Sequence, residues 1–539
     1  RALYFINPKA RGKKPMQIWT QGETENNSCW FPTIEDPAEK MTHEISITVD
    51  QKFQTLSNGI LMHSEDHEDG TRTDYWEMTK EHAVYLTMLA VGEFSATHER
   101  WKDVELTYMM EPGFAPYAQN IFGRTPEMLD FFSEKLGTPY PWSKYTQIVV
   151  RDFVSGAMEN TTASVFYEGL NQTAAQNADN NQDDIIAHEL FHHWFGNLVT
   201  AESWSNLPLN EAFATYGEYL WREHYYGKAD ADLHLLSDAK TYFDYAKNRD
   251  NKLIRFDYAD KEQMFDAISY QKGALILHAL RKLLGDEAFF QSLKNYLTTH
   301  AFQTAEVHDL RIAFEKTTGQ DLNWFFDQWF LNKGFPILKI EKQYYADAKK
   351  LKVSITQTQD STEAPLFRLP VSVKWFHQDS LQNQDIIIDK KVQTLVLNDV
   401  DSPYFWIETE NLLVKIDEEV DTREQYARFR NGRHFLNRYH AARYFAMYKN
   451  SKEAAQVFRE ALASSDWPIT YLGLLHFRPS SDLWEQQRLG DLALNAGQSA
   501  LRAEALSLLK KHYKGKASRK IFQQARHDIS EKVQKALRR

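Results

Sequence analysis

The sequence predicts a multidomain α+β protein. Two regions of short, alternating strands stand on either side of a long region with helical periodicity, and the last part of the chain is helical almost throughout. The chain has 539 residues, of which 42% are hydrophobic, so it can bury several cores and corresponds to roughly three or four domains.

The first β region is indicated by alternating apolar and polar residues. Runs at residues 45–49 and 85–91 are separated by the turn-forming pairs Asn58-Gly59 and Asp69-Gly70. The chain opens on a strand-like run at residues 3–6, so we expect upstream sequence to be missing from this domain.

The rest of the chain divides by the same criterion. Helical periodicity dominates from about residue 129 to 334, strands return at residues 351–356 and 369–373 with the spacing of a small β-sandwich, and paired helices follow. We therefore expect four domains, at residues 1–95, 96–335, 336–420 and 421–539.

Composition excludes several classes of protein. The formal net charge is -11, and the sequence contains no long run of basic residues. Both observations argue against nucleic-acid binding. Cys29 is the only cysteine, so any metal site must use histidines and carboxylates. No run approaches the 18 apolar residues of a membrane span, and we expect a soluble chain, favoured as a monomer. The compartment, cytoplasmic or periplasmic/extracytoplasmic, is left open.

A metal-binding pattern lies in the central region. His188 and His192 are four residues apart on one predicted helix face, with β-carbons about 6 Å apart, and can bind one Zn²⁺ through their imidazoles. Glu189 then lies beside the open coordination position. This pattern alone arises by chance in fewer than roughly one sequence in ten of this composition.

A third ligand follows on a second predicted helix, which opens after Pro208. Glu211 comes 19 residues after His192, and two histidines with one glutamate leave the fourth zinc position for water, the layout of a catalytic site. Glu218, seven residues further on the same face, either orients a ligand imidazole or is an exposed helical glutamate. His193 is rotated by about 100° around the helix, which predicts a role in packing or in supporting the ligand residues.

These residues and the segments around them resemble the aminopeptidase N family of gluzincin zinc metallopeptidases. The segments are Gly-Ala-Met-Glu-Asn at residues 156–160, His-Glu-Leu-Phe-His-His-Trp-Phe-Gly-Asn at 188–197, residues 204–211, and further matches at 19–23, 30–32, 36–37 and 269–274. The resemblance implies a β-saddle that lacks its N-terminal part, a thermolysin-like catalytic domain, a β-sandwich and a C-terminal helical (HEAT-like) domain.

The resemblance also implies roles for single residues. Glu159, with Glu23 as a second carboxylate, would bind the free α-ammonium of a peptide, and Tyr270 would stabilise the oxyanion. The remaining implied substrate-binding residues are Gln21, Gly156, Ala157, Met158 and Asn160, with the backbone of Gly156 and Ala157 pairing with the extended peptide. Without the zinc pattern, residues 156–160 are read as an ordinary turn.

We therefore expect a zinc aminopeptidase with one Zn²⁺ per chain, held by His188, His192 and Glu211. Glu189 would act as general base, and the substrates would be peptides with a free N-terminus. Two alternatives stay open: an epoxide hydrolase or endopeptidase with the same zinc site, and a scaffold without catalytic activity.

Overall fold

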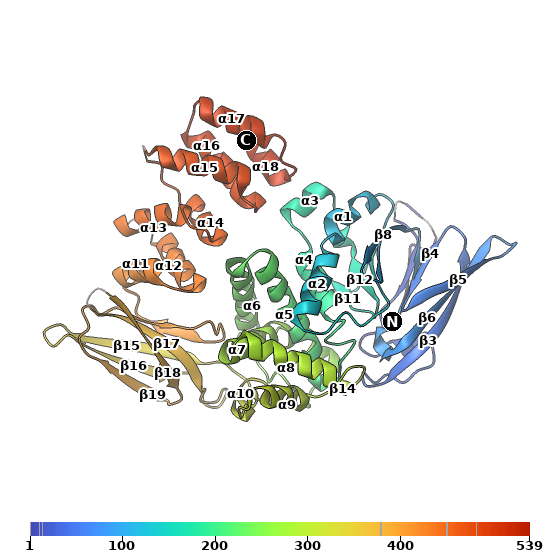
Figure 1. Ribbon diagram of the computed structural model, residues 1–539, viewed down its shortest axis with the longest axis horizontal. Coiled ribbons are helices and arrows are strands. Elements are labelled where there is room, and N and C mark those ends of the chain that lie inside the picture. Colours follow the sequence, from blue (N-terminus) through green and yellow to red (C-terminus); the bar gives the residue numbers. More distant parts are fainter. Residues whose placement is uncertain are drawn as a thin grey trace. The chain divides into compact units, whose positions relative to one another are not determined.

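The computed structural model describes residues 2–9, 11–12, 14–377, 380–448, 451–480 and 482–538. The chain forms two compact units (Figure 1). The first contains Arg1–Asn177, Asn181–Trp221 and Lys252–Leu331, and the second contains Ala178–Asn180, Arg222–Asn251 and Asn332–Arg539. The four-domain division of the sequence stays a prediction.

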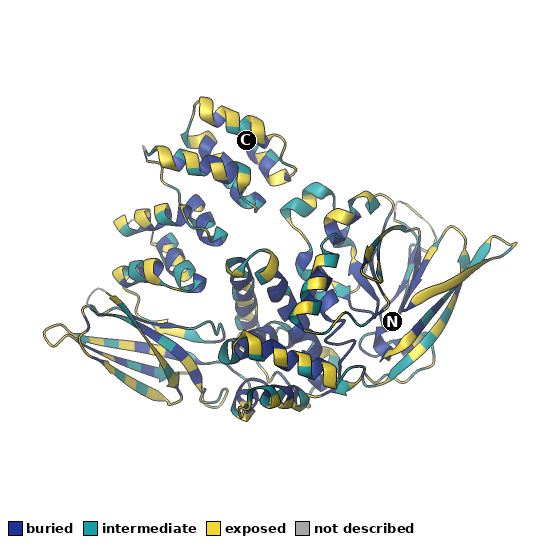
Figure 2. Ribbon diagram, in the orientation of Figure 1, coloured by how far each residue is buried: buried dark blue, intermediate teal, exposed yellow. Residues whose placement is uncertain are grey.

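Two antiparallel sheets form the N-terminal part of the first unit. One has the order β1 (Leu3–Ile6), β2 (Gln17–Thr20), β7 (Leu89–Gly92) and β4 (Gln54–Ser57). The other has the order β3 (Lys40–Asp50), β6 (Thr71–Ala83) and β5 (Ile60–Asp66). Their core includes Trp19, Leu56 and Trp76, whereas β5 is exposed along its whole length (Figure 2).

The prediction of a strand at residues 85–91 is wrong for the first half of that range. Val84–Leu86 forms a short 3-10 turn, η2, closed by the Thr87 N–H donating to the Val84 carbonyl at 3.0 Å. Tyr85 and Leu86 are both buried, so this segment enters the core as a turn, and only the following residues form β7.

A third sheet follows, and three of its strands, β10 to β12, correct the prediction that residues 129–334 are helical with intervening loops. Its order is β11 (Ala157–Met158), β12 (Ala163–Tyr167), β10 (Lys144–Val150), β9 (Val104–Met110) and β8 (Ser95–Trp101). Strand β10 is parallel to both neighbours and buried at every position. A strand covered on both faces has no polar alternation, which removes the periodic signal from its sequence.

Helices complete the first unit. They are α1 (Ala118–Phe122), α2 (Thr125–Lys135), α4 (Asp183–Phe191), α5 (Pro208–Tyr225), α7 (Gly273–Leu284), α8 (Asp286–Thr299), α9 (Val307–Thr318) and α10 (Asn323–Trp329), with α3 (Ala174–Asp179) ending in the second unit. The small pair β13 (Thr200–Ala201) and β14 (Thr304–Ala305) joins distant parts of the chain. Helix α5 begins at Pro208, as predicted, and is buried over most of its length (Figure 2).

The second unit contains α6 (Lys228–Arg249), two small sheets and a run of helices. The first sheet has the order β19 (Val392–Leu397), β16 (Lys350–Gln357), β15 (Ile337–Tyr345) and β21 (Lys415–Glu418). The second has the order β18 (Ser380–Ile388), β17 (Leu369–His377) and β20 (Phe405–Glu408). Strands predicted at 351–356 and 369–373 are thus confirmed.

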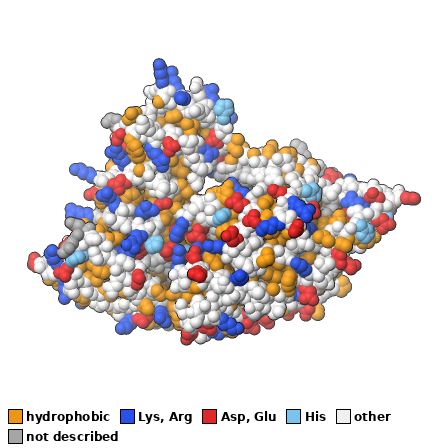
Figure 3. All heavy atoms as spheres, viewed as in Figure 1, with side chains coloured by type: hydrophobic (Ala, Val, Ile, Leu, Met, Phe, Trp, Pro, Cys, Tyr) orange, Lys and Arg blue, Asp and Glu red, His pale blue; other side chains and the backbone are white. Residues whose placement is uncertain are grey.

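The C-terminal part of this unit is helical, as predicted. Its helices are α11 (Thr422–Asn431), α12 (Phe435–Met447), α13 (Lys452–Leu462), α14 (Trp467–Leu475), α15 (Leu483–Asn495), α16 (Ser499–His512), α17 (Lys516–Ala525) and α18 (Glu531–Arg538). Acidic and basic side chains are interspersed on the face drawn in Figure 3. None of the helices in the described ranges is both long and apolar enough to cross a membrane.

Helices α4 and α5 approach closely at a glycine. A Cβ placed on Gly217 of α5 would lie 2.7 Å from Cγ and 2.8 Å from Cβ of Phe191, the last residue of α4. Phe191 is fully buried and packs against Phe132 and Phe195, with ring centroids 4.9 and 5.1 Å away. The absence of a side chain at Gly217 therefore sets how near the two helices lie.

We predict that Gly217→Ala lowers the free energy of unfolding by up to about 2 kcal/mol. The added methyl group overpacks the contact with Phe191 at a cost of about 1–3 kcal/mol, and the helix-propensity gain of Ala over Gly, about 1 kcal/mol, offsets part of that cost. Urea denaturation gives the measurement. Gly113→Ala is the matched control, since nothing lies within 4 Å of a Cβ at that site. Equal stability of both variants would contradict the packing argument.

Candidate metal centre and amine-binding site

Helix α4 carries the first histidine and the candidate base. Asn181 accepts a hydrogen bond from the Asp183 N–H at 3.2 Å, and two acidic residues, Asp183 and Asp184, occupy the first turn, where negative charge is favourable. Arg124 donates to the buried Asp183 carboxylate at 2.6 Å. The helix ends at Phe191, and His192 follows in helical conformation, so both histidines keep the i, i+4 relation predicted from the sequence.

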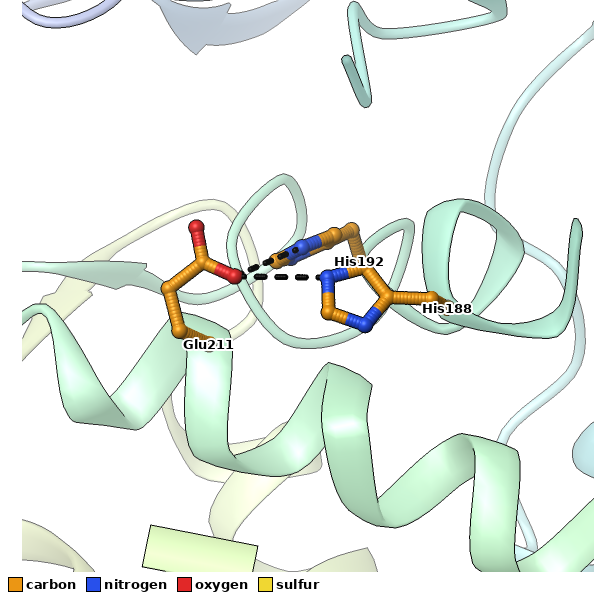
Figure 4. A group of neighbouring side chains, drawn as sticks. All are labelled: His188, His192 and Glu211. Atoms are coloured by element: carbon orange, nitrogen blue, oxygen red, sulfur yellow. Dashed lines mark ion pairs between the residues drawn. The ribbon is translucent and has the colours of Figure 1, made fainter. Parts of the chain in front are cut away.

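The three expected metal ligands meet at one point (Figure 4). Nε2 of His188 lies 3.3 Å, and Nε2 of His192 3.4 Å, from Oε2 of Glu211. With metal–ligand bonds of about 2.05 Å, as in zinc sites, the edge of a coordination tetrahedron is about 3.3 Å. These two separations match that edge, and all three donor atoms lie within 4.8 Å of one another, an arrangement in which two imidazoles and one carboxylate could share one ion.

Hydrogen bonds fix both imidazole rings. Glu218 lies with Oε1 2.8 Å from Nδ1 of His188, and the carbonyl of Phe195 accepts from Nδ1 of His192 at 3.0 Å. These acceptors place the proton on Nδ1 in each ring and leave Nε2 to face Glu211. The structure thus brings Glu218 to a ligand imidazole and not to an exposed helix face.

Further carboxylates surround the ligand glutamate. Carboxylate oxygens of Glu23, Glu159 and Glu211 lie within 4.8 Å of one another, and the same holds for one ligand atom each of Glu159, Glu189 and His192. Glu23 follows β2, Glu159 follows β11, and Glu189 is on α4. Segments far apart in the sequence therefore contribute to one acidic site.

Within the described residues, one oxygen in each of four of these carboxylates is buried without a hydrogen-bond partner. They are Oε1 of Glu23, Oε1 of Glu159, Oε2 of Glu189 and Oε2 of Glu211. Such atoms are costly unless a ligand satisfies them. Their arrangement fits a cation at His188, His192 and Glu211, with a second positively charged group beside Glu23 and Glu159.

The charges of the site shift its pKa values strongly. Burial raises the pKa of Glu189 to about 8, and burial together with the charge of Glu159 raises the pKa of Glu23. Burial alone would disfavour charge on His192, yet the carboxylates of Glu159 and Glu211 raise its pKa to about 9. A raised pKa for a buried histidine reflects a strongly negative potential at the site, which favours the binding of cations.

Tyr270 faces the same site. It lies in the π-helical turn η7 (Ile268–Lys272), and its ring stacks on that of His188 with centroids 6.2 Å apart. Asp266 positions the start of this turn by accepting from the N–H groups of Ile268 and Ser269 at 2.9 and 3.0 Å. Burial, and then the charges of Glu211 and Glu23, raise the pKa of Tyr270, so the phenol keeps its proton and can donate a hydrogen bond.

The remaining predicted residues lie along β2 and β11. Nε2 of Gln21 is 3.0 Å from Sδ of Met158, and Oε1 of Gln21 is buried without a partner among the described residues. Ala157 and Met158 form the edge strand of the five-stranded sheet, paired with β12 on one side. The carbonyl of Gly156 already accepts from the Tyr167 N–H at 3.1 Å. The Asn160 side chain is buried, and neither of its polar atoms has a hydrogen-bond partner in the part of the chain that the structure describes.

Two residues of the site, Asn197 and Asn210, were not assigned a role from the sequence, and the contacts of a third, His193, were not predicted. Asn197 donates to the Glu159 carbonyl at 2.8 Å, and Asn210 donates to the Tyr85 hydroxyl at 3.2 Å. His193 accepts from the Thr162 N–H at 3.2 Å. Local spacing carries no signal for these contacts, because each joins segments that are brought together only by the fold.

The fold and the side chains together are those expected of one class of protein, the HExxH metallohydrolases with a glutamate as third ligand. Comparison with known sequences narrows this class. The pattern of the peptidase family M1 domain matches residues 121–329, and that of the peptidase M1 N-terminal domain matches residues 1–86. The chain belongs to peptidase family M1, which confirms the resemblance to the aminopeptidase N family.

Named relatives are similar over part of their length. Aminopeptidase M1 of Arabidopsis thaliana is 30% identical over 346 residues, covering 63% of this chain and 39% of that protein. Tricorn protease-interacting factor F2 of Thermoplasma volcanium is 29% identical over 417 residues, with coverages of 75% and 51%. The chain thus spans about half or less of the length of these relatives.

A solved structure supports the fold. Aminopeptidase A of Legionella pneumophila, in complex with aspartic acid, aligns with a TM-score of 0.72 at 17% identity and covers 100% of this chain and 64% of that chain. At this identity, the likeness concerns the fold alone. It agrees with an N-terminal β domain, a mixed α+β region and a C-terminal helical domain, as predicted.

We predict that Glu218→Ala weakens zinc binding by about 10- to 100-fold, because the His188 ring loses the acceptor that fixes its Nδ1 proton and its orientation. Competition with a chromogenic chelator measures the dissociation constant. The control is Glu134→Ala, which removes an exposed carboxylate of α2. Unchanged zinc affinity in Glu218→Ala would show that Glu218 does not orient the ligand.

Proposed function

We propose that this chain is a zinc-dependent aminopeptidase, which removes N-terminal residues from peptides with a free α-amine. The observation that carries the proposal is the position of Glu23 and Glu159, whose carboxylate oxygens lie within 4.8 Å of that of the metal ligand Glu211. A hydrolytic site with an amine-binding carboxylate pair at this distance selects the first peptide bond of a chain.

The donor set favours zinc. Two imidazoles and one carboxylate suit Zn²⁺, whereas Mg²⁺ and Ca²⁺ prefer ligands that are all oxygen. His188, His192 and Glu211 would hold the ion. When bound, zinc would lower the pKa of a water molecule and polarise the scissile carbonyl.

Glu159 and Glu23 would bind the substrate ammonium. One buried oxygen of each carboxylate has no hydrogen-bond partner among the described residues. A free α-amine is positively charged, and its N–H groups can donate charge-assisted hydrogen bonds to both carboxylates. A blocked N-terminus has neither the charge nor the donors. A longer peptide extending past the clamp would leave these carboxylates unpaired, which disfavours endopeptidase action.

Glu189 would move the proton. Burial raises its pKa to about 8, and binding of a dication nearby would lower this value towards neutrality, where a carboxylate can both accept and release a proton. It would take a proton from the attacking water and deliver it to the leaving nitrogen. Tyr270, with its phenol protonated, would donate to the carbonyl oxygen as negative charge develops there.

The edge strand β11 offers a place for the peptide backbone. An extended substrate could add to the side of Ala157 and Met158 that faces away from β12, with its amine directed towards Glu159, the next residue. Gly156 at the start of this strand and Asn160 after it would border the bound peptide. The backbone pairing would hold the first peptide bond in a fixed orientation.

Two alternatives are weaker. An epoxide hydrolase or an endopeptidase with the same metal site would not need two carboxylates beside Glu211. A scaffold without catalytic activity would not be expected to keep the complete set of metal ligands, base and phenol that His188, His192, Glu211, Glu189 and Tyr270 supply. One ion per chain and a monomeric state stay predictions.

We predict that Glu189→Gln lowers kcat for a leucyl anilide by about 10²- to 10⁴-fold, because the amide cannot accept the proton of water. Zinc content should stay at one ion per chain, as measured by atomic absorption on the same samples. Glu134→Gln is the control for loss of an exposed carboxylate on the protein surface. Near-native turnover in Glu189→Gln would rule out this base.

We predict that the native protein cleaves a free leucyl peptide and leaves its N-acetylated form intact. Glu159→Ala should lower kcat/KM for the free peptide by roughly 10²-fold, since a charge-assisted hydrogen bond to the ammonium is lost and Glu23 alone has to bind it. Liquid chromatography of the products gives both rates. Equal cleavage of free and acetylated peptides by the native protein would contradict the aminopeptidase assignment and support an endopeptidase.

A further inference from the structure

The turn that carries Glu159 has an unfavourable backbone conformation. Residues 159–162 connect β11 with β12, and Thr162 in this turn has φ of +68°. For a β-branched residue the left-handed region is rarely occupied and costs about 1–3 kcal/mol. The turn therefore depends on its surroundings to keep this shape, and with it the position of Glu159.

Hydrogen bonds hold Thr162 from several elements. Its carbonyl accepts from the Thr146 N–H at 2.9 Å and from Nζ of Lys144 at 3.3 Å, both in β10. Its hydroxyl accepts from the Gly59 N–H at 2.9 Å. These contacts attach the end of the turn to the sheet and to the N-terminal region, but they do not reach the residues of the metal site.

His193 makes that connection for Thr162, in addition to the Asn197 amide that donates to the Glu159 carbonyl at the other end of the turn. Its Nε2 accepts from the Thr162 N–H at 3.2 Å, and its Nδ1 donates to the carbonyl of Glu189 at 3.1 Å. The ring is fully buried and packs edge-on against Tyr145, with centroids 4.8 Å apart. One rigid ring thus links two segments of backbone: the turn that carries Glu159 and the helix residue Glu189, the candidate base.

We propose that His193 is a positioning residue, which fixes the spacing between the amine-binding turn and the helix with Glu189 and the metal ligands. The inference deepens the proposed function and rests on it for the meaning of that spacing. Both ring nitrogens are required, because one accepts from the turn and the other donates to the helix. The peptide is held at its amine, and its first carbonyl has to lie beside Glu189 to react. If the distance between the turn and the helix changes, the amine is bound more weakly, but the zinc ion stays bound.

The test uses zinc-loaded protein and L-leucinamide, whose affinity is measured by calorimetry. His193→Phe keeps a ring of similar size but loses both hydrogen bonds, and we expect the affinity for leucinamide to fall about tenfold, since one buried N–H loses its partner. KM for a leucyl anilide should rise to a similar extent, with zinc content unchanged.

Two other substitutions separate positioning from stability. His193→Gln keeps one donor and one acceptor on a longer side chain and should recover most of the affinity, whereas the shorter His193→Asn should not. If His193→Phe does not fold, the comparison of Gln with Asn carries the test. Tyr108→Phe is the control, because it removes a buried hydroxyl that donates to Glu99 at 2.7 Å, away from the turn.

The outcomes are distinct. Lower thermal stability of the His193 variants with native leucinamide affinity and native KM would overturn the inference and leave His193 a packing residue. Failure of the native protein to bind leucinamide would overturn it too. If the native protein binds leucinamide, His193→Phe weakens this binding, and no anilide is cleaved, then the positioning role holds and the proposed turnover is wrong.

Discussion

Repulsion among buried carboxylates is the constraint on which the rest of the site depends. Glu23, Glu159, Glu189 and Glu211 come from four separate segments and lie in one place, each with an oxygen that has no partner within the described structure. In a medium of low dielectric constant, such an arrangement is stable only if positive charge joins it. Two imidazoles supply part of that charge, and a metal ion with a substrate ammonium would supply the rest.

The fold holds these groups together against their repulsion. Gly217 allows α5 to approach α4 closely enough for Glu211 to face both histidines, and aromatic packing at Phe191 and Phe195 surrounds the crossing. Glu218 and the Phe195 carbonyl turn the imidazoles so that their Nε2 atoms converge. The geometry is therefore preorganised by contacts that do not themselves touch a substrate.

Sequence spacing predicted the local part of this site well. The i, i+4 histidines and the helix starting at Pro208 follow from patterns within single elements, and the strands of the second unit have clear alternation. Strand β10 was missed because burial on both faces removes alternation, and residues 85–86 were mistaken for strand because an apolar turn has the same composition. Glu23 is 136 positions from Glu159 in the sequence, so only the family resemblance, and no pattern within the chain, pointed to their proximity.

The central claim is that one zinc ion and one substrate amine share the charge of this site. A crystal of the zinc-loaded protein soaked with L-leucine, with data collected at the zinc absorption edge, tests it most directly. The account predicts a single anomalous peak bonded to Nε2 of His188, Nε2 of His192 and Glu211, and a leucine amine within hydrogen-bonding distance of Glu23 and Glu159. Zinc bound at other residues, or leucine bound with its amine directed away from both carboxylates, would contradict the account.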